Sequence, residues 1–144
     1  MNLDDLNKCV RSELSAIETY QQALDKHRGE YGHQPGFQQL SQMLADHEEA
    51  LSRLRNVMQQ KGGTPPNESG AWGTWSKTVM GAAKLFGDKA ALKALKEGEE
   101  SGLKEYQDIV DDPTTASDVR KVVAANMSNQ RQHIGQLDTL IDVA

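Results

Sequence analysis

Apolar residues recur at alternating steps of three and four in four separate segments of this 144-residue chain. That spacing places them on one face of an α-helix, so each segment predicts an amphipathic helix with one buried stripe, or seam. The predicted helices span residues 3–27, 35–60, 88–111 and 116–142. Four such helices in a chain of this length predict one all-α domain, residues 1–144, with a single core.

The connection between the second and third helices, residues 61–87, is too long for a tight turn between neighbours. Its segment AWGTWSKTVMGAAKLFG predicts a short amphipathic helix that packs on the bundle through Trp72, Trp75, Val79 and Phe86. A long middle connection between two helical hairpins is what a crossover bundle requires. A mobile linker between the hairpins is the alternative interpretation.

Charge and composition exclude several classes of partner. The net charge is −5 and no Lys/Arg-rich run is present, so we expect no nucleic-acid partner. No apolar stretch approaches the roughly 20 residues that cross a bilayer, and the N-terminus lacks the pattern of a signal peptide, so we expect no membrane partner. The single cysteine, Cys9, excludes an intrachain disulfide. These features together predict a cytoplasmic protein.

The chain repeats itself at an offset of 86 residues. ELSAIETYQQAL, beginning at Glu13, and EESGLKEYQDIV, beginning at Glu99, share Glu, Ser, Tyr and Gln at matching positions. At the same offset His47 matches His133, so Glu and His are 34 residues apart in both halves. A common register across two helices and a loop predicts two equivalent hairpins related by a pseudo-twofold axis.

The seams carry four acidic or imidazole side chains, one on each helix: Glu13, His47, Glu99 and His133. A glutamate is almost never fully buried without a partner, which here is a histidine, a tyrosine hydroxyl or a metal ion. Glu–His pairs within each hairpin would satisfy these groups by charge-assisted hydrogen bonds. The four residues therefore form one candidate constellation.

Other polar residues lie on or beside the seams. Tyr20 and Tyr106 follow the two glutamates by seven residues, two helical turns, and together with Gln130 they are predicted to support the polar core. Asp46 lies off the seam and is expected on a solvated face. His27 falls near the sequence RGEYGHQPG, which breaks the helical pattern, and we expect it to be exposed.

Two groups of motifs resemble a known family. FQQLSQMLADHEEALSRL resembles the Phe-x-x-Leu…Glu-x-x-His…Leu helix of the ferritin-like di-iron bundles, including the rubrerythrin-type proteins. Glu followed by Tyr seven residues later is similar to that family as well. The crossover motifs GAWGTW and LFGD, with LKEGEESGLKEY, resemble a smaller branch of bacterial ferritin-like four-helix proteins. The resemblance implies a ferritin-like bundle, but this branch brings no known activity with it.

The sequence departs from the di-iron pattern at two positions. A di-iron bundle takes a Glu from each of two helices and a Glu-x-x-His from each of the others. Leu44 and Gln130 stand three residues before His47 and His133, where the family has carboxylates that bridge the irons. Without those two charges, a standard ferroxidase centre is not expected.

Three functions remain open at this point. The sequence favours a non-catalytic bundle with a degenerate di-iron site and no cofactor, acting through its surface or assembly, and no catalytic or organic cofactor-binding residue is assigned. The alternative is a metal-handling protein or oxidoreductase with a single Fe, Zn or Mn ion on Glu13, His47, Glu99 and His133. A small-ligand carrier with a pocket near the seam tyrosines is the third. Homodimer formation through exposed helix faces is also left open.

Overall fold

The computed structural model describes residues 3–69, 73–82 and 85–144. Within these ranges the chain is helical and has no strand, which confirms the all-α prediction. The helices are α1 (Leu3–Tyr31), α2 (Pro35–Gln60), α3 (Gly73–Gly81), α4 (Lys89–Asp111) and α5 (Ser117–Asp142).

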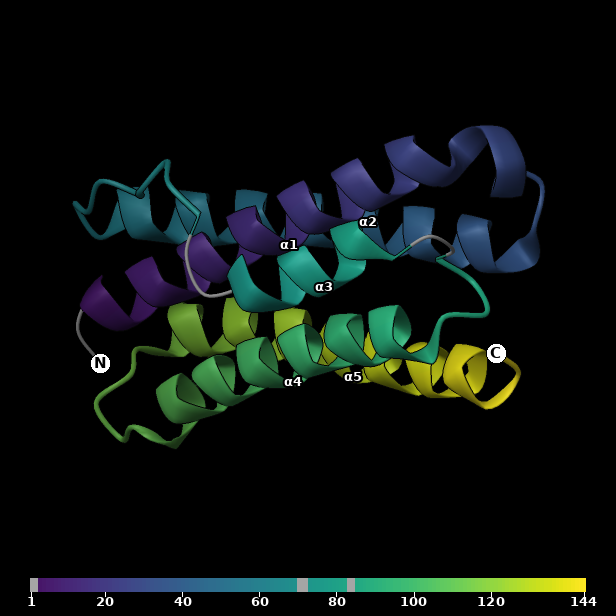
Figure 1. The fold of residues 1–144 in the computed structure, drawn as a ribbon. Coiled ribbons are helices and arrows are strands. Elements are labelled where there is room, and N and C mark those ends of the chain that lie inside the picture. Colours follow the sequence, from purple (N-terminus) through teal and green to yellow (C-terminus); the bar gives the residue numbers. More distant parts are fainter. Residues whose placement is uncertain (1–2, 70–72, 83–84) are drawn as a thin grey trace.

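Each long helix packs against two others, in the cyclic order α1, α2, α5, α4. Figure 1 shows two antiparallel hairpins, α1–α2 and α4–α5, that lie side by side. The connection between them runs along the length of the bundle, so α2 and α4 point in the same direction (Figure 1). The four long helices therefore enclose one core between the two hairpins.

The crossover carries the short helix α3, which packs against α4 and α1. Val79 is fully buried there, and the half-buried Trp75 donates its indole N–H to Glu97 at 3.0 Å. Lys26 on α1 donates to two backbone carbonyls at the end of α3. These contacts anchor the crossover on the bundle. Trp72, which was also expected to pack here, lies outside the described residues.

The first helix is longer than the sequence pattern predicts, because it runs to Tyr31 instead of ending at residue 27. His27 therefore lies inside α1 and is buried, and the expectation of an exposed position was wrong. A lone glycine such as Gly29 costs a helix only about 1 kcal/mol relative to alanine, so it does not stop a helix that packs against a neighbour. α1 ends at Tyr31, and Pro35, the first residue of α2, disfavours helical geometry at Gln34, which is extended.

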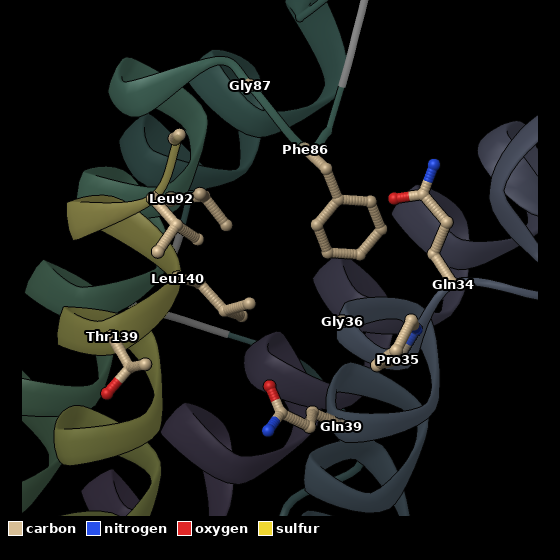
Figure 2. Close-up of a pocket in the computed structure, with 11 residues that line it drawn as sticks. Gln34, Pro35, Gly36, Gln39, Phe86, Gly87, Leu92, Thr139 and Leu140 are labelled. Carbon is tan, nitrogen blue, oxygen red and sulfur yellow. The ribbon is translucent and has the colours of Figure 1, made fainter.

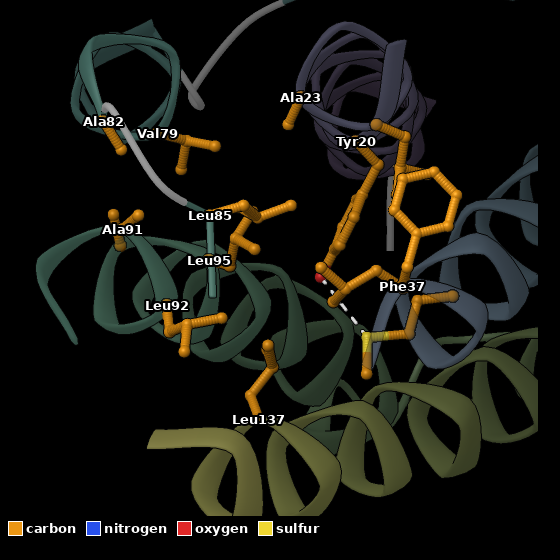
Figure 3. Close-up of a cluster of buried hydrophobic side chains, with 14 of the residues drawn as sticks. Tyr20, Ala23, Phe37, Val79, Ala82, Leu85, Ala91, Leu92, Leu95 and Leu137 are labelled. Carbon is orange, nitrogen blue, oxygen red and sulfur yellow. Dashed lines mark hydrogen bonds between the residues drawn. The ribbon is translucent and has the colours of Figure 1, made fainter. Parts of the chain in front are cut away.

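The buried apolar side chains form two clusters separated along the bundle. In every long helix, one polar seam residue falls between the positions of the first cluster and those of the second. Figure 3 shows the first cluster, where side chains from the long helices meet those of the crossover. It includes Tyr20, Leu24, Phe37, Leu40, Val79, Leu85, Leu92, Leu95 and Leu137. The second includes Leu6, Val10, Leu54, Met58, Tyr106, Ile109, Val119 and Val123. The core is therefore apolar at both ends and polar in the middle.

Candidate functional site

The four polar seam residues meet at the middle of the bundle. Glu13 comes from α1, His47 from α2, Glu99 from α4 and His133 from α5, and each is at most 2% exposed. Both Glu–His pairs within the hairpins exist, and they join into one hydrogen-bonded cluster. The apolar clusters on either side keep this polar layer away from bulk water.

His47 connects the two hairpins. Its Nδ1 lies 2.6 Å from Glu13 Oε2, and its Nε2 lies 2.6 Å from Glu99 Oε1. An imidazole donates from both nitrogens only when it is protonated on both, so this geometry suits an imidazolium. Burial alone would lower the pKa of His47, but the attraction of Glu99 and Glu13 outweighs burial and raises that pKa well above its usual value.

His133 connects the buried layer to the surface. Its Nδ1 lies 3.2 Å from Glu99 Oε1, and its Nε2 lies 2.8 Å from Oδ2 of Asp46, whose side chain is 20% exposed. The interpretation of Asp46 as a solvated residue was wrong, because this side chain turns from α2 towards α5. The only sequence signal was its position beside His47. The residue 86 positions later is Gln132, so this contact breaks the pseudo-twofold symmetry.

Glu99 is the central acceptor of the cluster. Its Oε1 receives hydrogen bonds from His47, His133 and the Tyr20 hydroxyl. Burial alone would raise the pKa of Glu99, but the charge of His47 and the hydrogen bonds from both imidazoles lower it to about 2. Glu99 is therefore ionised throughout the physiological pH range.

Each of the two seam tyrosines donates a hydrogen bond to the glutamate of the other hairpin. Tyr20 donates to Glu99 at 2.9 Å, and Tyr106 donates to Glu13 at 2.6 Å and accepts a bond from Asn126 at 3.2 Å. Burial, together with the nearby carboxylates, raises the pKa of both hydroxyls well above the usual value, so they remain donors. Each hairpin thus satisfies the carboxylate of the other, which ties the halves of the core together.

The two tyrosines are expected to contribute unequally to stability. Tyr106→Phe leaves Glu13 Oε1 without a donor, whereas after Tyr20→Phe both imidazoles still donate to Glu99 Oε1. We expect Tyr106→Phe to lower the free energy of unfolding by about 2–3 kcal/mol and Tyr20→Phe by less. Urea denaturation of both variants measures the difference. Equal losses would contradict the assignment of donors.

The positions that carry bridging carboxylates in the ferritin-like family hold no charge here. Leu44 is half-buried against the first apolar cluster. Gln130 is buried, and its Oε1 has no hydrogen-bond partner among the described residues. The negative charge of the core therefore comes from Glu13, Glu99 and the partly exposed Asp46.

His47, Glu99 and His133 form a buried group that could hold a metal ion. One candidate ligand atom from each lies within 4.8 Å of the others. Glu13, the fourth predicted ligand, is outside this group and instead lies on the far nitrogen of His47. Two imidazole nitrogens and a carboxylate suit first-row transition metals such as Fe²⁺ or Zn²⁺.

A pocket of about 520 Å³ lies at another place, where α2 begins and α5 ends. Figure 2 shows apolar side chains and uncharged polar groups around it. Its lining includes Gln34, Gln39, Phe86, Leu92, Thr139 and Leu140. Neither seam tyrosine lines this pocket, so it is not the tyrosine-side pocket that a small-ligand carrier was expected to have.

Fold and site together define an all-helical bundle protein with a His–Glu–His group buried at its centre. The chain belongs to the family described as "Domain of unknown function (DUF2383)", which matches residues 2–112. The match includes Glu13, His47 and Glu99, whereas His133 on α5 lies beyond it. Comparison with curated proteins found no match, and comparison with solved structures found none. Among the described helices, none has both the length and the apolar character needed to cross a membrane.

Proposed function

We propose that this chain is a ferritin-like four-helix bundle that binds one divalent metal ion through His47 Nε2, His133 Nδ1 and the Glu99 carboxylate. The supporting observation is the orientation of the two imidazoles. Each turns one nitrogen towards Glu99 and the other towards a different carboxylate. Metal-binding histidines are commonly held in this way, because a carboxylate on the far nitrogen fixes the tautomer and the ring orientation.

Glu13 and Asp46 are the two orienting carboxylates in this proposal. Glu13 holds His47 through Nδ1, and Asp46 holds His133 through Nε2. Tyr106 holds Glu13 in turn. The donor set fits a single ion, since Leu44 and Gln130 supply no bridging charge for a second one. A divalent ion held by two imidazoles and one carboxylate acts as a Lewis acid with coordination positions left for further ligands.

A metal-free polar layer is the second candidate, and the sequence alone favoured it. In that case the bundle keeps the ferritin-like architecture and acts through its surface or assembly. The short His47 contacts support it, because at 2.6 Å both ring nitrogens bond directly to carboxylates. In the metal-binding candidate, an ion takes the place of the protons that the imidazoles direct at Glu99.

Metal analysis separates the two candidates. The protein is purified without chelator and titrated with Mn²⁺, with Zn²⁺ or, under anaerobic conditions, with Fe²⁺. It is expected to bind one ion per chain and to melt at a higher temperature. The His47→Ala/His133→Ala double variant should lose this uptake, while the exposed His33→Ala control keeps it. Asp46→Asn should weaken binding by about 10–100-fold. If the wild-type chain takes up none of the three ions, the metal-binding candidate is wrong and the metal-free bundle, which acts through its surface or assembly, remains.

A further inference from the structure

Two buried oxygen atoms of the polar layer have no hydrogen-bond partner within the part of the chain that the structure describes. They are Oε2 of Glu99, which is 0% exposed, and Oε1 of Gln130, which is 4% exposed. Buried acceptors are nearly always paired, because an unpaired one loses its hydration without gaining a hydrogen bond, and the loss is larger for a charged group. Two such oxygens in one core layer indicate a missing donor or cation.

The register of α4 against α5 places both oxygens in the same region. Glu99 bonds to His133, and Tyr106, about two turns along α4, bonds to Asn126 on α5. Gln130 lies between Asn126 and His133 on α5, opposite Gly102 on α4. The amide of Gln130 therefore occupies the core level next to the His133–Glu99 pair.

Gly102 makes room for this amide. A Cβ atom at position 102 would lie 2.5 Å from Gln130 Nε2, a distance at which one group must move. Gly102 is itself buried inside α4, where glycine is less favourable for the helix than alanine. A glycine that disfavours its own helix here permits the close approach of an amide with an unpaired oxygen.

We propose that the amide oxygen of Gln130 is a further ligand of the metal ion, beside both oxygens of Glu99. This inference rests on the proposed function. It gives a donor set of two nitrogens and three oxygens, in which Gln130 adds a ligand without adding charge. Such a set suits Fe²⁺ or Mn²⁺, which accept oxygen-rich coordination by more than four ligands, better than it suits the four-coordinate preference of Zn²⁺.

Co²⁺ titration of the metal-free protein tests the inference, because Co²⁺ absorbs visible light weakly with five or six ligands and strongly with four. The wild-type chain is expected to bind one Co²⁺ with weak absorption. Gln130→Leu should bind about 10–100-fold more weakly, with stronger absorption per bound ion. Gln130→Glu restores an oxygen and should restore tight binding. Gln132→Leu, at an exposed position of the same helix, is the matched control.

The melting temperature of the metal-free protein separates a ligand role of Gln130 from a purely structural one. If Gln130 is a ligand, replacing its unpaired amide by leucine should leave the melting temperature of the metal-free protein unchanged or raise it. Gly102→Ala, which displaces the amide without removing it, should weaken Co²⁺ binding in the same direction and serves if Gln130→Leu does not fold. Equal affinities and spectra for wild type and Gln130→Leu would overturn the role of Gln130 alone. No Co²⁺ uptake by wild type would overturn the metal site itself.

Discussion

Replacing His47 with alanine is expected to lower the free energy of unfolding of the metal-free protein by about 3–5 kcal/mol. His47 bonds to two buried carboxylates, Glu13 and Glu99, and its removal leaves both without their nearest cation. Neither carboxylate can reach bulk water by a small movement, because each is at most 2% exposed and apolar clusters lie on both sides. Urea denaturation at neutral pH measures the loss.

Two histidine controls make this result specific. His33→Ala changes an exposed residue and should leave stability within about 0.5 kcal/mol of wild type. His133→Ala should cost less than His47→Ala, because Glu99 keeps two donors and Asp46 is partly hydrated. If His47→Ala has the same urea midpoint as wild type, water reaches Glu13 and the polar layer is not buried.

Acid is expected to destabilise the metal-free protein through Glu99. Its pKa is about 2 in the folded chain, against 4.5 as the ordinary value. Because the folded pKa is lowered, the carboxylate contributes stability that is present above pH 4.5 and lost as pH falls towards 2. The difference corresponds to about 3 kcal/mol. The raised pKa of His47 reports the same ion pair from its other side, so the two contributions are not added.

Comparing the wild-type chain with Glu99→Gln isolates this contribution. Urea unfolding at a series of pH values between 6 and 2 should show wild type losing about 3 kcal/mol more than the variant over this window. The variant should be less stable at pH 6 and have the flatter profile. Parallel profiles for the two proteins would mean that Glu99 titrates normally and is not held by the imidazoles.

Much of the fold can be read from the periodicity of the chain. The three-and-four spacing predicts the helices, because a buried face must repeat with the helical period. The length of the crossover indicates two hairpins, and the short helix with Val79 is found there. The predicted C-terminal end of α1 was wrong, since the free energy that Gly29 costs the helix is small compared with what the packing of α1 on α2 contributes. The ferritin-like arrangement stays a prediction, as no comparison tests it.

The residues of the candidate site could be predicted from the sequence, but the contacts between them could not. Glu13, His47, Glu99 and His133 stand out because ionisable side chains are rare on buried seams. The role of Asp46 could not be predicted, since it lies off the seam and reaches His133 only through the placement of α2 beside α5. Likewise, the repeat suggests symmetric pairs but says nothing of the bond between His47 and Glu99.

The sequence by itself determined most of the side chains that enter the core, since a helical repeat assigns each residue to a face. The 86-residue offset also places a Glu, a His and a Tyr at matching positions of both halves. Only the tertiary structure decided which atoms meet. The exchange of tyrosines between hairpins and the unpaired oxygen of Gln130 depend on the axial register of separate helices. That register is set by packing between residues far apart in the chain, which a pattern within one helix does not contain.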